Sequence, residues 1–170
     1  MKKFIEITRD LDKWEVQRII NVIRRIDTKD VRTPIVIRIS SRGGDLLPTL
    51  RLIRELRRRN LSVTCLVEKA GSAAALLAIT CPRRLIKRDG RMMLHVVQLT
   101  LPITSISEKG EVPPHILNKG RRLQKRWETM IKRYTRLRDE NLKEIMTPGA
   151  QLVFNAKGAL RWGLVDEIVD

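Results

Sequence analysis

Apolar residues in the first half of the chain follow two alternating patterns, one typical of strands and one typical of amphipathic helices. Residues 4–7 and 35–39 are short apolar stretches, and each leads into a segment with apolar residues at every third or fourth position. Asp10 and Asp12 precede the first segment and could cap a helix there. The apolar positions are Val16, Ile19, Ile20, Ile23 and Ile26 in the first segment and Leu47, Leu50, Ile53 and Leu56 in the second.

The same alternation then repeats. Residues 61–67 read as a strand, 68–71 as a turn, 72–79 as an apolar helix and 92–94 as the next strand. Strands that alternate with helices pair in parallel and are usually buried on both faces. The pattern therefore predicts an α/β fold built on a mostly parallel, buried sheet.

The second half begins with a different pattern. Apolar and polar residues alternate over 96–114, which predicts a hairpin inserted between two elements of the fold. A long helix is predicted after Pro113 and Pro114, because a narrow apolar seam with basic residues around it follows them. The seam consists of Leu123, Trp127, Met130, Tyr134 and Leu137.

The chain is predicted to close with a short helix and a strand. Asn155 can cap a helix over 156–162, and Gly163 can end it. Residues 164–169 then supply the last strand. At 170 residues and 42% hydrophobic content, we expect one domain that spans 1–170.

The chain carries 35 basic and 19 acidic residues, a formal charge of +16, which makes nucleic acid, anionic surfaces and acidic partners candidates. Aromatic residues make up 4% of the chain, so stacking platforms for nucleic acid are few, and no nucleic-acid-binding module is recognisable. We therefore expect solvated helix faces rather than a nucleic-acid interface. The basic runs are Arg57, Arg58, Arg59, Lys119, Arg121, Arg122, Lys125, Arg126, Lys132, Arg133, Arg136 and Arg138.

The two cysteines and the N-terminus bear on location. Cys65 and Cys81 lie in apolar surroundings without CxxC spacing, so we expect buried thiols in a reducing cytosol, and neither a disulfide framework nor a zinc site. The N-terminus lacks the apolar run of a secretory signal. The longest apolar stretch, 70–81, is shorter than the ~20 residues that span a bilayer. A cytoplasmic protein without a membrane segment is predicted.

Three sites could carry chemistry. Gly43 and Gly44, between a strand and a helix, could hold an oxyanion or phosphate on backbone amides, or form only a tight turn. Ser72 could be a nucleophile or a helix cap, and His95 could be a base or a structural histidine. These sites end successive β-α units, and such ends meet at one edge of a parallel sheet.

Four motifs resemble those of the Clp protease proteolytic subunit, a caseinolytic serine peptidase family of the crotonase-like superfamily. They are Ser-Ser-Arg-Gly-Gly at 40–44, Ala-Gly-Ser-Ala-Ala-Ala at 70–75, Met-Met-Leu-His at 92–95 and Ala-Leu-Arg-Trp-Gly-Leu-Val-Asp at 159–166. The resemblance runs from about residue 5 to residue 169. It implies repeated β-β-α units with a mostly parallel sheet, and a protruding handle helix within the handle region, residues 96–146.

The resemblance also implies roles for individual residues. Ser72 would be the nucleophile, His95 the base, and the amides of Gly44 and Ala73 the oxyanion hole, with no metal or organic cofactor. The subunits would assemble into a heptameric ring or a pair of rings that encloses polypeptide substrates, and Trp127 and its seam would be the contact between rings.

Several positions depart from the family pattern. The place of the triad carboxylate falls on Gln151, whose carbonyl could orient the imidazole without stabilising the imidazolium; Asp139 or Glu140 could substitute. Val96 and Val97 replace Gln-Pro after the histidine, and the segment from there to the handle is longer than usual. The chain also begins almost at its first strand, so we expect no axial gate, which leaves coupling to a AAA+ unfoldase open.

The sequence therefore predicts a serine peptidase that acts by Ser-His acyl-enzyme chemistry inside an oligomeric chamber. Two alternatives remain: a catalytically weak or inactive structural ring subunit, and a crotonase-like acyl-CoA enzyme, whose fold also holds a thioester enolate on two backbone amides.

Overall fold

The computed structural model describes residues 3–26, 34–147 and 149–170. In these ranges six strands form one mixed sheet in the order β1-β2-β3-β4-β5, with β6 also paired to β4. The first four strands are parallel, β6 is parallel to β4, and β5 is antiparallel to it. The predicted α/β class with a mostly parallel sheet is confirmed. The strands are β1 (Lys3–Ile7), β2 (Ile35–Ser41), β3 (Val63–Gly71), β4 (Arg83–Leu94), β5 (Leu152–Asn155) and β6 (Glu167–Val169).

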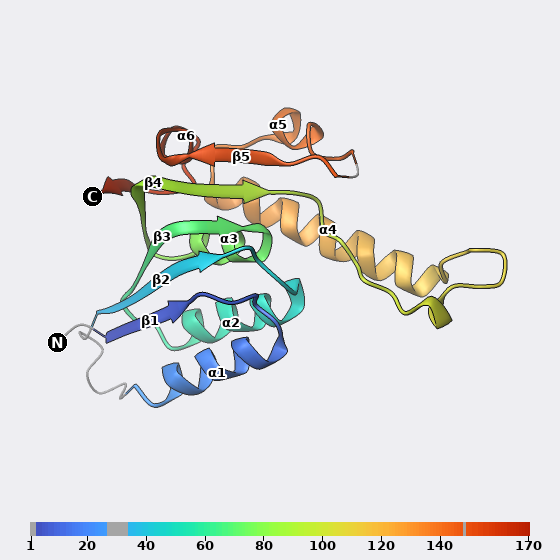
Figure 1. Cartoon of the computed structure of the whole chain (residues 1–170), viewed down its shortest axis with the longest axis horizontal. Helices are drawn as coiled ribbons and strands as arrows, with labels where there is room; N and C mark the ends of the chain where they lie inside the picture. Colours follow the sequence, from blue (N-terminus) through green and yellow to red (C-terminus); the bar gives the residue numbers. More distant parts are fainter. Residues whose placement is uncertain (1–2, 27–33, 148) are drawn as a thin grey trace.

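Helices connect the parallel strands, as the alternating pattern predicts. They are α1 (Lys13–Arg24), α2 (Leu46–Arg58) and α3 (Ser72–Ile79). Asp12 caps α1 by accepting hydrogen bonds from the amides of Trp14 and Glu15 at 2.9 and 2.7 Å. In Figure 1, α1 and α2 run side by side near the β1 edge, and α3 lies behind β3.

The sheet is covered by helices on one face. Ile35, Ile37 and Ile39 of β2 are completely buried, whereas Arg38 between them is exposed, and so is Phe4 of β1. The prediction of a sheet buried on both faces is therefore wrong for the described chain. The alternation of β2 is that of a strand with one covered face.

Two strands are longer than predicted. β3 continues to Gly71 through the segment that reads as a turn, with a shift of register between Val67 and Lys69. β4 begins at Arg83, nine residues before the predicted strand. Its basic first half has no strand pattern, and it is extended because β3 pairs with one edge of it and β6 with the other.

The predicted long helix is present as α4 (Pro114–Tyr134), and Figure 1 shows it running from behind β4 out past the sheet. The predicted hairpin before it is wrong. Residues 96–113, all described, contain no strand; they hold the 3-10 turn η2 (Ile103–Ser105) and a turn in which the Ser107 amide donates to the Glu111 carbonyl at 3.0 Å. No strand of the described chain lies beside this segment to pair with it, and Ile103 is 85% exposed.

Trp127 does not lie where the resemblance implies. It is 3% exposed, and it packs with Leu123 and Ile131 of α4 against the core of its own chain. In this conformation Trp127 is not available as a contact between rings. The short helices α5 (Asp139–Lys143) and α6 (Ala156–Arg161) follow, and the predicted cap of α6 is confirmed by the 2.8 Å hydrogen bond from the Gly158 amide to Asn155 Oδ1.

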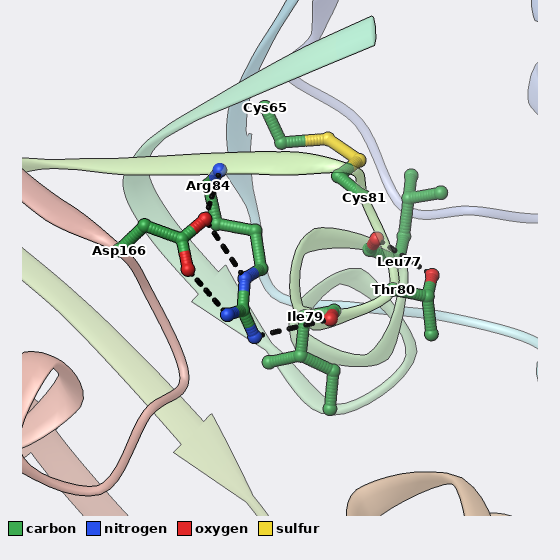
Figure 2. Close-up of a disulfide and its surroundings, with 7 residues drawn as sticks. All are labelled: Cys65, Leu77, Ile79, Thr80, Cys81, Arg84 and Asp166. Atoms are coloured by element: carbon green, nitrogen blue, oxygen red, sulfur yellow. Dashed lines mark hydrogen bonds and ion pairs between the residues drawn. A yellow bond between two sulfur atoms is a disulfide. The ribbon is translucent and has the colours of Figure 1, made fainter. Parts of the chain in front are cut away.

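Cys65 and Cys81 form a disulfide, so the prediction of free thiols is wrong (Figure 2). Cys65 lies in β3, and Cys81 follows α3 where the chain returns to the sheet, which brings their Cα atoms to 6.1 Å. That separation lies within the range of disulfides, and spacing along the sequence does not reveal it. The argument for a reducing compartment that rested on these cysteines therefore falls.

Arg84 ties the C-terminal segment to the sheet, as Figure 2 shows in part. Its guanidinium pairs with Asp166 and donates to the carbonyl oxygens of Tyr134 and Gly163 at 2.8 and 2.9 Å. Burial opposes ionisation of Asp166, but the hydrogen bonds and charge of Arg84 outweigh it and lower the pKa of this carboxyl.

We expect Arg84→Met to lower the free energy of unfolding by about 2–4 kcal/mol, because hydrogen bonds to charged groups contribute roughly 1.5–3 kcal/mol each. Folding lowers the pKa of Asp166, so the ionised carboxyl adds to the free energy of unfolding. This contribution is present above about pH 4, the ordinary pKa of Asp, and is lost as the pH falls through the folded pKa. Urea unfolding at fixed protein concentration, between pH 7 and pH 3, measures both effects.

Arg88→Met is the matched control, because Arg88 pairs with Asp170 and both side chains are more than three-quarters exposed. Its loss should stay below about 0.5 kcal/mol. Equal losses in the two variants would contradict a structural role of Arg84.

Among the helices of the described ranges, none combines the length and apolar character needed to cross a bilayer.

Candidate active site

The turn after β2 lies against the junction of β3 and α3 at one edge of the sheet. A Cβ atom on Gly43 would lie 2.7 Å from the carbonyl oxygen of Gly71 and 2.8 Å from Cβ of Ser72. A Cβ atom on Gly71 would in turn lie 2.5 Å from the carbonyl oxygen of Arg42. The glycines therefore allow a backbone approach that any side chain would prevent.

The turn after β2 is held on its other side by the segment that precedes α1. The amide of Leu11 donates to the carbonyl of Gly43 at 2.6 Å, and the amide of Asp45 donates to the carbonyl of Leu11 at 3.0 Å. Gly43 and Gly44 have φ values of +124° and +142°, which favour glycine. The turn is thus fixed from two directions, and its double glycine is required by its conformation.

Two amides at this edge are free to bind a ligand. Within the described parts of the chain, neither the amide of Gly44 nor that of Ala73 donates a hydrogen bond to a protein acceptor. Ala73 lies in the first turn of α3, where backbone amides have no partner inside the helix. These are the two amides that the sequence predicts for an oxyanion hole.

Ser72 has an unusual backbone conformation. Its φ is +51°, a left-handed value that costs a non-glycine residue roughly 1–3 kcal/mol and persists only where the surroundings enforce it. Such strain concentrates at functional sites, so it favours the nucleophile over a simple helix cap. The residue that caps α3 is Gly71, and no side chain of the described residues donates or accepts a capping hydrogen bond there.

Four of the predicted residues share one cavity of about 640 Å³. Ser72, Ala73, Gly44 and His95 all line it, and both Ser72 and His95 are half-buried. The register of β3 and β4 explains why Ser72 and His95 meet. Gly71 pairs with Met93 in these parallel strands, so Ser72 and His95 both follow the same end of the β3–β4 pair. Leu123 and Trp127 of α4 form part of the apolar wall.

The His95 ring has a defined orientation. Its Nδ1 lies 2.6 Å from the carbonyl oxygen of Val96. A carbonyl only accepts, so this contact requires the proton on Nδ1 and leaves the lone pair of the neutral ring on Nε2. Within the described residues no hydrogen bond joins the ring to Ser72 Oγ, a contact that in serine peptidases often tightens only with substrate bound.

Gln151 lies just outside the site. Leu94 pairs with Leu152 at the end of the antiparallel β4–β5 ladder, so the register sets positions 95 and 151 opposite each other one step further. The Gln151 side chain is exposed, does not line the cavity and makes no hydrogen bond within the described chain. The structure therefore brings the two backbones together and leaves the side chains unconnected.

The substitute acids lie elsewhere. Asp139 accepts a 2.7 Å hydrogen bond from Lys132, which lowers the pKa of this carboxyl. Glu140 is exposed on α5, and neither residue lines the cavity. Sequence reasoning also missed Gln124 of α4, which contacts the segment after His95, and no sequence signal sets this glutamine apart from its neighbours.

A serine, an imidazole and two free amides around one cavity, at the edge of a mostly parallel sheet, form an arrangement suited to acyl-transfer chemistry. A sequence model of the Clp protease family matches residues 1–170. The chain belongs to the Clp protease family. This membership supports a peptidase function in general, and members of the family typically form oligomeric rings. A search of curated proteins found no match.

Proposed function

We propose that the protein is a serine peptidase that cleaves peptides or unfolded proteins through an acyl-enzyme on Ser72. The observation that carries this proposal is the strained Ser72, which shares a cavity with His95 and with the free amides of Gly44 and Ala73. Family membership supports the same chemistry. In the family's manner, homo-oligomeric rings would enclose the cavity.

The residues have complementary roles in the proposed reaction. Ser72 Oγ attacks the peptide carbonyl while His95 Nε2 takes its proton, and the oxyanion accepts hydrogen bonds from Gly44 and Ala73. The C–N bond then breaks, and His95 returns the proton to the leaving amine. Water, deprotonated by His95, attacks the acyl-enzyme and releases Ser72 with the second product.

A fluorophosphonate probe tests this proposal. We expect stoichiometric labelling of the protein, none of Ser72→Ala, and normal labelling of Ser62→Ala, in which an exposed serine is lost. In a complete Ser-His-Asp triad, removing the serine lowers kcat by about 2 × 10⁶-fold, whereas removing the acid alone lowers it by about 3 × 10⁴-fold. The ratio of these losses is on the order of 10², so Ser72→Ala should lower kcat by about that factor in a protein that already lacks the acid. Labelling that survives Ser72→Ala would refute the assignment.

A catalytically weak or inactive ring subunit is the second candidate. One observation favours it: in the described chain, no carboxylate forms a hydrogen bond or an ion pair with the His95 ring. Sedimentation combined with turnover of fluorogenic peptides separates the two candidates. Rings that leave both peptides and unfolded protein untouched, and that take up no probe, would establish the structural role.

A further inference from the structure

The segment that follows His95 is held by the handle helix. Gln124 Oε1 accepts a 2.8 Å hydrogen bond from the amide of Val97. Gln124 Nε2 in turn donates to Glu128 Oε1 at 2.7 Å, one helical turn further along α4. The Glu128 side chain is half-buried and, within the described chain, forms no ion pair.

His95 and Gln124 both form hydrogen bonds to the same peptide unit. The carbonyl of Val96 accepts from His95 Nδ1, and the amide of Val97 donates to Gln124. Both groups belong to the peptide bond between Val96 and Val97, which is planar and trans, so they point in opposite directions. Fixing the N–H with Gln124 therefore also fixes the carbonyl that holds the imidazole.

All three hydrogen bonds run in the same sense. His95 donates to the peptide, the peptide donates to Gln124, and Gln124 donates to the Glu128 carboxylate. Hydrogen bonds in such a chain polarise one another, and a carboxylate at its end favours positive charge at its start. The chain would therefore orient the imidazole and stabilise the imidazolium, the two contributions of a triad acid.

We propose that Gln124 and Glu128 are positioning residues, which replace the missing triad carboxylate by a relay through the Val96–Val97 peptide. This inference rests on the proposed function, since it assigns the residues that orient His95, the proposed base, and stabilise its charged form. Gln124 fixes the direction of the relay, and Glu128 supplies its charge. Neither residue touches the substrate in this role, and the relay needs no other group from the C-terminal segment.

The protonated nitrogen of His95 is the direct test. The chain has two histidines, and His115 is exposed at the start of α4, so magic-angle-spinning NMR of protein labelled with ¹⁵N-histidine resolves two rings in an assembly of any size. We expect neutral His95 to carry its proton on Nδ1. In Gln124→Met the ring should become a mixture of tautomers, and kcat should fall about tenfold with KM unchanged, as for one lost hydrogen bond.

Glu128→Gln separates charge from orientation. It keeps an acceptor for Gln124, so the Nδ1 proton should remain, while loss of the anion should weaken stabilisation of the imidazolium in the transition state and reduce kcat about threefold. Gln17→Met is the matched control, because Gln17 Nε2 donates to Asn21 Oδ1 at 2.8 Å over the same i,i+4 spacing on α1. Its kcat and His95 spectrum should equal those of the unchanged protein.

The outcomes separate the relay from the peptidase proposal. If the unchanged protein takes up the fluorophosphonate but Gln124→Met keeps both its Nδ1 proton and its kcat, the relay is wrong and the peptidase stands. If the unchanged protein takes up no probe, the peptidase proposal fails, and the ¹⁵N spectra still decide whether Gln124 orients the ring. An Nε2 proton in the unchanged protein overturns the relay by itself, whatever the fold of the variants.

Discussion

Gln151→Asp is expected to raise kcat/KM by between about 10-fold and 10⁴-fold. The upper bound is the cost of replacing a triad acid by its amide. The expected gain is smaller because the Gln151 side chain is exposed and the Val96 carbonyl already holds the His95 Nδ1 proton. A carboxylate opposite His95 would stabilise the imidazolium as the proton moves from Ser72.

A matched amide at position 151 separates the charge of the new side chain from its size. Gln151→Asn is the control, since it has the size of aspartate without the charge. If the two variants are equally active while Ser72 still takes up the probe, the side chain at 151 does not reach the base.

The positions of the elements that build the site could be predicted from the sequence where burial dominates. After Ser72 the run 73–79 is entirely apolar, and α3 covers the predicted residues 72–79. The convergence of Gly44, Ser72 and His95 followed from the alternation of strands and helices. In these segments the local pattern and the tertiary contacts favour the same structure.

Where pairing partners decide the structure, the sequence was a poor guide. The basic residues at 83–91 carry no strand pattern, yet they are extended between β3 and β6. Residues 96–113 alternate like the strands of a hairpin but form no strand, because none of the described strands pairs with them. The contact of Gln124 with the Val97 amide joins residues 27 positions apart, and nothing local distinguishes this glutamine.

Gly43→Ala is expected to lower kcat by about 10²–10³-fold, the cost of losing one oxyanion donor. The added Cβ would lie 2.7 Å from a backbone oxygen of Gly71 and 3.2 Å from the amide nitrogen of Ala73. Both neighbours are backbone, so the turn must move, and it carries the free amide of Gly44 with it. Peptide turnover measures the loss, and melting temperature and sedimentation show whether the variant folds and assembles.

Gly110→Ala is the matched control for this effect. Gly110 also has a positive φ, +77°, but a Cβ there would meet nothing within 4 Å. Both variants place alanine in a backbone conformation that favours glycine, at a cost of about 1–2 kcal/mol, so a comparable loss of stability is expected from strain alone. Only Gly43→Ala displaces the oxyanion amides. If it folds and keeps the kcat of Gly110→Ala, the amide of Gly44 does not stabilise the transition state, and the oxyanion hole must be sought elsewhere along the cavity.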